Sequence, residues 1–396
     1  MARPKRCKRL KWLRLVLAVG AATGLAAAYR FALRYRERVG LPRRSPVETS
    51  PADFELDFEE VAIPAGDHAL AGWFIPAPAT PAPRRRRLVA ATQTAGGARS
   101  TAAAHATAET AALVAKAGVP IDRRPAIAVV HGWESNRGRT FAHVRYLHAA
   151  GFHCLVFDVR GHGDNPPETL PINVPEFADD TAAAARWLAT RPEVSAVGVL
   201  GHSMGGAGAS VAASREPEIA AVVSMSAPAD LVRMTLKTFQ MAEMQIPEPV
   251  ATPLAWFTAA ILLVPRRHSV EEASAVAAAA LYRGPLLLVH GAQDHGVPVE
   301  HMDLIARAAT AKRDQNDAPV ETLVLPDFGH RWLYEDADCR RRVAAFFARW
   351  LGGGLSPETA GDRAAAVMVE RPPDPVYSFG ALAAKTPPAN RTIDLD

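Results

Sequence analysis

Short apolar runs alternate with longer amphipathic or alanine-rich segments through most of this chain. The runs predict strands buried on both faces, and the segments between them predict helices. The strands are expected near Ile127, His153, Val197, Ala221, Leu286 and Thr322, the helices near 140–150, 176–190, 203–214, 299–311 and 331–351, and an opening hairpin at 54–63 and 70–75. This alternation predicts an α/β protein whose mostly parallel, eight-stranded sheet is flanked by helices.

The same pattern divides the chain into segments. Residues 53–351 hold the predicted sheet and helices. Within them, residues 77–124 are rich in Ala, Pro, Thr and Arg and predict a disordered insertion, because links between strands are normally short. Residues 227–283 predict a cap between the sixth and seventh strands. Residues 352–396 contain several prolines and little periodicity, which predicts a flexible tail.

Residues 1–44 form a basic segment around an apolar run. Residues 15–29 carry no charge, and Arg14 and Arg30 can extend toward the surfaces of a bilayer. This favours a signal-anchor helix, while a signal peptide cleaved at residues 26–28 and a peripheral amphipathic helix stay open. We expect a single N-terminal anchor in a bacterial inner membrane, with the catalytic domain on the periplasmic side. Arginines on both sides of the run weaken the argument for orientation.

Composition narrows the possible partners. The net charge of +4 comes mainly from the chain ends and one inserted basic run, so no nucleic-acid partner is expected. Three cysteines, Cys7, Cys154 and Cys339, do not make a disulfide framework. The oligomeric state cannot be inferred from these features.

The segment Gly201-His202-Ser203-Met204-Gly205 follows a predicted strand and precedes a predicted helix. Glycines on both sides allow a sharp turn that presents the Ser203 hydroxyl above the edge of the sheet. The context of strand before and helix after makes this G-x-S-x-G pattern far more specific than the five letters alone. Ser203 is therefore a candidate nucleophile.

Three further motifs complete a catalytic constellation in the order Ser, Asp, His. His131-Gly132-Trp133 ends a predicted strand, so the amides of Trp133 and Met204 are candidates for an oxyanion hole. Asp294 follows the strand at Leu286, and His330 follows the last strand. Asp327 is a rival for the acid because it lies closer to His330 in the sequence, and Asp294 could instead cap the helix near Pro298.

With these motifs together, residues 54–351 resemble the α/β-hydrolase-fold serine hydrolases. The matching pieces are His131-Gly132-Trp133, Asp158-Val159-Arg160-Gly161-His162-Gly163, the segment 201–205, His290-Gly291-Ala292-Gln293-Asp294, and Phe328-Gly329-His330. The resemblance implies the α/β-hydrolase fold, with a helical cap after the sixth strand. It also implies that Asp158 and Arg160 brace the loop beside the active site.

The chemistry of these residues agrees with the resemblance. A serine hydroxyl needs a base, for which His330 is the candidate, and Asp294 would orient that histidine. We interpret His131, His162, His202 and His290 as packing or hydrogen-bonding residues. Neither an H-E-x-x-H motif nor paired cysteines support a metal, so no metal or other cofactor is expected.

The predicted cap should determine specificity. Its apolar, Met-rich composition suits an acyl or aromatic group, and Met234, Phe239, Trp256 and Phe257 are the candidate substrate-binding residues, although these side chains could also simply pack the cap onto the body. We therefore expect a small-molecule acyl substrate and cleavage of an ester or thioester. An amide is a further option, but the cap lacks an acidic cluster for a peptide amine. An acyltransferase with the same triad and a non-catalytic, membrane-tethered binding protein are the alternatives.

Overall fold

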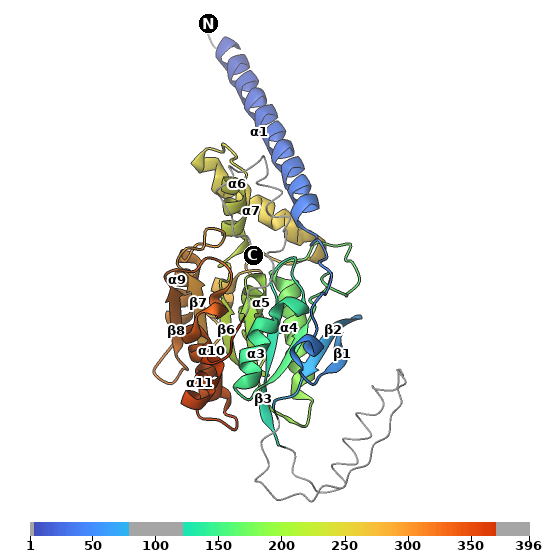
Figure 1. The fold of residues 1–396 in the computed structure, drawn as a ribbon. Helices are drawn as coiled ribbons and strands as arrows, with labels where there is room; N and C mark the ends of the chain where they lie inside the picture. Colours follow the sequence, from blue (N-terminus) through green and yellow to red (C-terminus); the bar gives the residue numbers. More distant parts are fainter. Residues whose placement is uncertain (1–3, 79–121, 370–396) are drawn as a thin grey trace, which may run out of the picture.

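The structure of the chain is a computed structural model that describes residues 4–78 and 122–369. Its eight strands form one sheet in the order β1-β2-β4-β3-β5-β6-β7-β8, and all pairs from β4 to β8 are parallel. The strands are β1 (Glu59–Ala65), β2 (His68–Ile75), β3 (Arg124–Val130), β4 (His153–Phe157), β5 (Val194–His202), β6 (Ile219–Met225), β7 (Leu286–Gly291) and β8 (Val320–Leu325). This architecture confirms the predicted fold class (Figure 1).

The central strands are buried on both faces by helices. Along β3, Ala126 and Ala128 face one hydrophobic cluster, and Ile127 and Val129 face the other. The small side chains lie toward α4 (Val174–Ala189), α5 (Met204–Ala213), α8 (Ala275–Ala279) and α9 (Glu300–Thr310), while the larger ones lie toward α3 (Phe141–Ala149), α10 (Ala337–Leu351) and α11 (Pro357–Ala365). The period of two in β3 therefore assigns its side chains to two separate cores.

The segment between β6 and β7 forms a helical cap beyond the carboxyl ends of the strands (Figure 1). The cap consists of α6 (Leu231–Met241), α7 (Glu248–Leu263) and the 3₁₀ turn η3 (Val264–Arg266), after which α8 returns to the body and packs on α5 and α9. The helical residues Glu248–Arg266 are long and apolar enough to span a membrane by length and composition alone, and 28% of that window is buried.

The N-terminal segment is one long helix, α1 (Pro4–Val39), that projects from the cap end of the body (Figure 1). Its C-terminal part packs on the protein. Phe31 and Tyr35 contact Phe239 of α6 with ring centroids 5.5 and 6.1 Å apart, and Arg36 Nη1 donates to the carbonyl of Ile261 in α7. The chain then continues through the 3₁₀ turn η1 (Pro51–Phe54) into β1.

Two expectations for the C-terminal region need correction. The helix expected over 331–351 begins at Ala337, because Trp332 is left-handed, with φ 66°, and Asp336 caps the N-terminus through a bond from the Cys339 N–H. The tail expected over 352–396 is not loose throughout. Residues 357–365 form α11, whose Ala360 and Ala364 are buried against α10.

Other expectations fall partly outside the described part of the chain. The predicted insertion at 77–124 is described only at its edges, 77–78 and 122–124, and the tail only to residue 369. Most of the remaining predicted elements are present with shifts of a few residues at their ends. The predicted first strand moves most, since residues 51–54 form η1 and β1 starts at Glu59.

Candidate active site

Ser203 lies at the sharp turn between β5 and α5. Its backbone has φ 54° and ψ −122°, a conformation that an L-residue seldom adopts. The turn requires glycines for close approach: a Cβ at Gly205 would overlap the carbonyl oxygen of His131, and one at Gly201 would overlap the Gly205 carbonyl. The Ser203 N–H donates a 2.8 Å bond to the Met225 carbonyl, which fixes the strained residue against β6.

Three side chains from distant parts of the chain meet at this turn. His330 Nε2 lies 3.0 Å from Ser203 Oγ, and His330 Nδ1 lies 2.6 Å from Asp294 Oδ2. His330 and Asp294 follow strands β8 and β7, whose carboxyl ends bring them to the edge where β5 presents the serine. The rival acid Asp327 is exposed and is not the partner of the His330 ring.

Both carboxylate oxygens of Asp294 have hydrogen-bond partners within the protein. Its Oδ1 accepts bonds from the Gly296 and Val297 N–H groups, and its Oδ2 also lies 3.3 Å from His290 Nε2. Burial favours the neutral acid, but the charge interaction with His330 and the hydrogen bonds from both histidines hold the pKa of Asp294 below its usual value. The carboxylate is thus ionised beside His330, the form that stabilises an imidazolium. The bonds to Gly296 and Val297 also order the loop before α9, whose N-cap position is occupied by Val299, so Asp294 is not the cap of that helix.

The other motif histidines are buried hydrogen-bonding groups. Burial, with a smaller contribution from the neighbouring His330, lowers the pKa of His202 to about 3, so its Nε2 donates as a neutral ring to the His330 carbonyl at 2.8 Å. Burial likewise lowers the pKa of His131 to about 4. Its Nε2 accepts a bond from the Val159 N–H, and its Nδ1 donates to the Gly132 carbonyl. These rings hold the loops around the serine rather than acting as its base.

The two amides expected to form an oxyanion hole lie on either side of the serine turn. Met204 is the first residue of α5, where backbone N–H groups lack helical partners. Gly132 is in contact with Ser203, and a Cβ there would lie 3.2 Å from Ser203 Cβ. Trp133, Met204 and Ser203 line one pocket. Among the described residues, no bond from the Trp133 or Met204 amide to another group is found, so both are available to a ligand.

A pocket above Ser203 lies between the body, the cap and α1. Its cap side is formed by Met234, Thr238 and Met241 of α6 and Leu262 of α7. Tyr35 and Val39 of α1 also line it. The N-terminal helix therefore contributes directly to the wall of the candidate active site, which the sequence analysis did not anticipate.

Of the four cap residues proposed to bind substrate, only Met234 lines this pocket. Phe239 is buried, and its ring packs against Phe31 and Tyr35 of α1. Trp256 is 56% exposed, and Phe257 is half-buried on the same helix. The expectation is corrected for these three residues, which do not line the pocket. The packing of α1 on the cap, which no local pattern reports, holds the ring of Phe239.

The loop after Trp133 is held by the segment that follows α1. Glu134 is buried in a left-handed conformation with φ 55°, and its Oε1 accepts a 3.0 Å bond from the Arg43 N–H. Ser45 Oγ donates to the Glu134 carbonyl, and Asn136 Nδ2 donates to the Ser45 carbonyl. Glu134 was missed because a glutamate after a H-G-W turn carries no distinctive signal.

Asp158 and Arg160 brace the loop beside the site. Asp158 is fully buried and accepts bonds from the Arg137 N–H and the Arg137 guanidinium. Arg160 pairs with Asp180 of α4. These contacts fit the structural role that the resemblance implied. No cluster of His, Cys, Asp and Glu suited to a metal ion is found among the described residues.

Comparisons with known proteins agree with this architecture. Residues 122–272 match the family model described as "Serine aminopeptidase, S33". A Mycobacterium tuberculosis protein described as uncharacterized is 29% identical over 209 residues, 52% of this chain and 63% of that protein. The human protein ABHD12B is 23% identical over 235 residues, 58% of this chain and 62% of its own length. The chain thus spans less than two thirds of the length of either relative.

Solved structures show the same fold. The esterase Pf2001 of Pyrococcus furiosus superimposes with a TM-score of 0.54 at 20% identity, over 80% of this chain and 98% of the esterase. A second crystal form of that enzyme gives 0.53 at 21% identity, over 78% and 100%. At such identity the likeness concerns the fold. Together with the family match it confirms the resemblance drawn from the motifs and supports a serine hydrolase in general.

Proposed function

From the α/β-hydrolase fold of this chain, we propose that it is a serine hydrolase that cleaves carboxylic ester or thioester bonds through an acyl-enzyme. The observation that carries the proposal is the 3.0 Å contact between Ser203 Oγ and His330 Nε2, with Asp294 2.6 Å from the other ring nitrogen. Nucleophile, base and orienting acid are thus in hydrogen-bond reach without rearrangement.

Each residue has one role in the reaction. His330 Nε2 takes the proton of Ser203 as Oγ attacks the carbonyl carbon, and the Trp133 and Met204 amides donate to the oxyanion that forms. His330 then gives the proton to the leaving oxygen or sulfur, and the acyl group stays on Ser203. Water enters by the same route, His330 takes its proton, and the acid is released. Asp294 stays ionised and stabilises the imidazolium in both halves.

The pocket favours an acyl group over a peptide. Its lining is mostly apolar, and its acidic members, Glu134 and Asp230, have partners within the protein. Glu134 accepts from the Arg43 N–H, and Asp230 pairs with Arg233. Neither offers a free carboxylate for the amine of a peptide substrate. An uncharged acyl chain suits this lining better.

The proposal includes membrane attachment through α1. The helix runs without interruption from Pro4 to Val39, and its uncharged residues 15–29 are flanked by basic residues. Such a segment suits a single anchor in a bacterial inner membrane, with the catalytic domain on the periplasmic side. Extraction of membranes with alkaline carbonate and digestion of intact spheroplasts test anchoring and sidedness. Release by carbonate, or protection of the domain in spheroplasts, overturns the corresponding part.

The central test is labelling of the full chain in detergent by a fluorophosphonate probe. Wild type should be labelled, Ser203→Ala should not, and His330→Ala should react far more slowly. Product analysis with short-chain p-nitrophenyl esters, thioesters and added alcohols then separates hydrolysis from acyl transfer. A folded wild-type protein that neither labels nor hydrolyses any of these substrates overturns the proposal and favours a binding protein.

A further inference from the structure

The exposed face of α7 is a continuous apolar ridge. Pro249, Pro253, Trp256 and the partly exposed Ala260 of α7, followed by Val264 at the start of η3, recur every three or four residues, and no charged residue lies between Glu248 and Arg266. Trp256 and Val264 are 56% and 58% exposed. The opposite face of the helix, with Ala255, Ala259 and Leu262, is buried. An exposed Trp at the centre of an uncharged helical stripe is typical of a surface that contacts another apolar phase.

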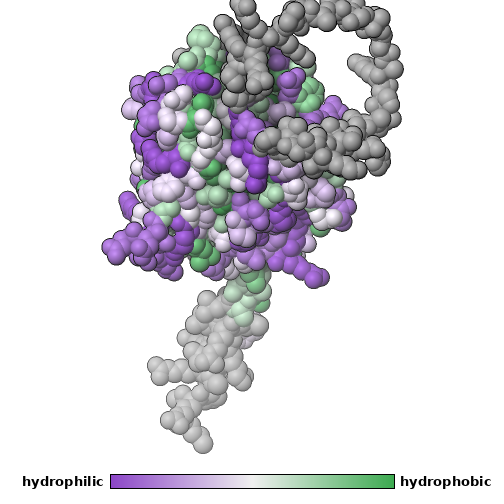
Figure 2. All heavy atoms as spheres, turned by 90° about the horizontal axis from the view of Figure 1, so that it is seen from below, coloured by the Kyte–Doolittle hydropathy of each residue, from purple (hydrophilic) through white to green (hydrophobic). Residues whose placement is uncertain are grey.

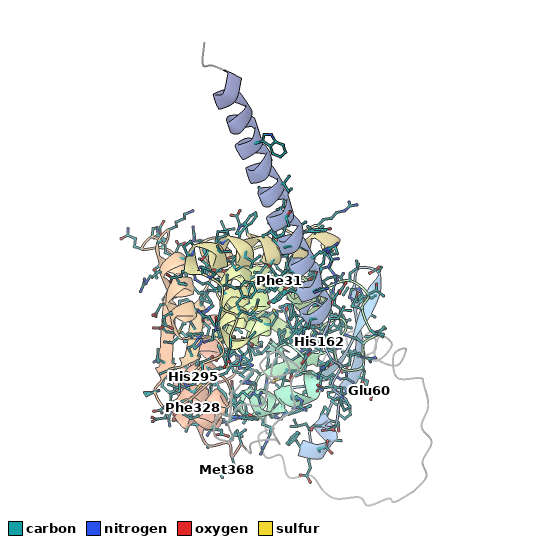
Figure 3. All side chains as sticks on the ribbon, turned by 90° about the horizontal axis from the view of Figure 1, so that it is seen from above. Phe31, Glu60, His162, His295, Phe328 and Met368 are labelled. Atoms are coloured by element: carbon teal, nitrogen blue, oxygen red, sulfur yellow. The ribbon has the colours of Figure 1, made fainter. Side chains whose placement is uncertain are left out.

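The ridge lies where α1 leaves the protein. α1 packs along α7, and both occupy the cap end of the molecule (Figure 1). Figure 3 shows Phe31 of α1 beside the cap helices. In the part of the opposite end that Figure 2 leaves uncovered, hydrophilic residues predominate and the apolar patches are small. The apolar surface is therefore on the side that faces any membrane entered by α1.

The spacing along α1 leaves little room between the membrane and the cap. The uncharged run ends at Tyr29, which is exposed, and Ala32 is already fully buried against the protein. Three residues of helix rise about 4.5 Å, less than one turn. If residues 15–29 lie in a bilayer, the surface of the cap must lie within roughly that distance of its boundary, and no linker separates them.

The same helix continues into the pocket. Tyr35 and Val39 follow Ala32 by about one and two turns and line the pocket that contains Ser203. Leu262 of α7 and Met234 and Met241 of α6 line it as well. The helices at the cap end of the molecule, α1, α6 and α7, thus also form part of the wall of the pocket that contains Ser203.

We propose that α7 lies in the surface of the bilayer that α1 enters, and that the substrate is an acyl amphiphile drawn from this bilayer into the Ser203 pocket. The occupant of the ridge is the lipid surface, because α1 brings that surface to it. The choice of substrate class rests on the proposed hydrolase function. The docking of α7 does not depend on it.

Docking is tested by fluorescence of the full-length protein in phosphatidylcholine–phosphatidylglycerol vesicles. Cys7 is replaced by Ser, and the remaining native cysteines, Cys154 and Cys339, are buried. In this background a single cysteine is introduced by Trp256→Cys or, as a control, by Met368→Cys, and is labelled with NBD. Met368 is 81% exposed at the edge remote from α7 (Figure 3). We expect blue-shifted emission and quenching by spin-labelled lipids at position 256 only. Equal, water-like emission at both positions overturns the docking.

Delivery of substrate is tested by a pair of matched substitutions. Trp256→Glu should lower the rate of hydrolysis of an ester lipid held in vesicles about tenfold, because one large apolar side chain changes the partition of α7 into the bilayer by about that factor. The rate at which the same variant hydrolyses p-nitrophenyl acetate in solution should stay within about twofold of wild type. Leu281→Glu, at an equally exposed apolar position near the start of β7, should leave both rates within about twofold.

The outcomes separate the two proposals. Equal losses on the vesicle and soluble substrates by Trp256→Glu, or equal effects of Trp256→Glu and Leu281→Glu, overturn delivery from the bilayer. If the wild-type protein hydrolyses none of these substrates in a Ser203-dependent way, the proposed function is overturned, and the substrate class with it. The NBD measurement still decides whether α7 is docked.

Discussion

The backbone N–H of Arg43 donates a 3.0 Å hydrogen bond to Oε1 of Glu134, the residue next to Trp133. This bond joins the segment that leaves the N-terminal helix to the loop that carries one of the two oxyanion donors. Glu134 has φ 55°, so its backbone is held in a conformation that costs about 1 kcal/mol or more for a residue with a side chain. The bond to Arg43 helps to keep that conformation, and with it the direction of the neighbouring amide.

Glu134→Ala should therefore lower kcat about tenfold with little change in KM, because a misdirected amide weakens stabilisation of the transition state more than binding of the substrate. Glu134→Gln keeps an Oε1 acceptor for the Arg43 N–H and should stay within about twofold of wild type. Steady-state kinetics on a soluble ester measure both. Equal losses in the two variants, or an effect on KM alone, contradict this positioning role.

The pairing of His330 with Asp294 predicts unequal effects of two similar substitutions. Asp294→Asn should lower kcat by about 10⁴, because an amide neither fixes the tautomer of His330 nor stabilises its cation. Asp327→Asn, three residues before His330 but exposed, should change kcat less than about twofold. Single-turnover acylation by a p-nitrophenyl ester measures the step directly. A larger loss at Asp327 than at Asp294 would reverse the assignment.

The position of Val39 in the pocket wall predicts a change of specificity from a residue of the N-terminal helix. Val39→Trp should lower kcat/KM for long-chain acyl esters about tenfold or more, because the indole fills space that the chain would occupy. Acetyl esters should be affected less than about twofold. Glu37→Trp, an exposed position of the same helix, is the matched control. A uniform loss across chain lengths in Val39→Trp would indicate damage to the fold instead.

Buried histidines predict how stability depends on pH. Burial lowers the pKa of His143 to about 4, below the value of about 6.5 in an unfolded chain. Between these values the unfolded chain binds the additional proton, so the free energy of unfolding falls as the pH falls, by up to about 1.4 kcal/mol per unit for this group. Its contribution is complete above about pH 6.5 and is lost toward about pH 4.

His143→Gln removes that proton-binding difference. The free energy of unfolding of the variant should therefore fall less steeply between about pH 6.5 and about pH 5, while above about pH 7 the two proteins should differ by a constant amount. Urea unfolding in mild detergent, followed by tryptophan fluorescence, measures both curves. Parallel curves over the whole range would show that His143 does not contribute to the pH dependence.

Local patterns were sufficient for most of the sheet. Strand β5 and the turn at Ser203 follow from a short apolar run and from two glycines within five residues, and such signals do not depend on the rest of the chain. α11 was missed because its helix depends on contacts with the rest of the chain rather than on a local signal. Its buried residues are small, Ala360 and Ala364, and its helix is stabilised by packing on α10 and by Arg340, which donates to the carbonyls of Ala364 and Ala365.

The cap shows more clearly how little the sequence alone says about which side chains reach the pocket. Composition identified an apolar, Met-rich segment, yet only Met234 of the four proposed residues reaches the pocket. Whether an apolar side chain in a helix faces substrate, solvent or another helix depends on its neighbours in space. Phe239 faces α1, and Trp256 faces outward, because α1 and the body cover the other faces of α6 and α7.

The sequence by itself determined the order of strands and helices, the serine turn and the residue types of the triad, since turn chemistry and hydrophobic period act over a few residues. Only the tertiary structure decided that Asp294 rather than Asp327 meets His330, that Ser203 and His330, 127 residues apart, lie 3.0 Å from each other, and that Tyr35 and Val39 of the N-terminal helix close the pocket. These relationships arise from the packing of segments distant in the chain, and side-chain contacts of that kind leave no periodic trace in either segment.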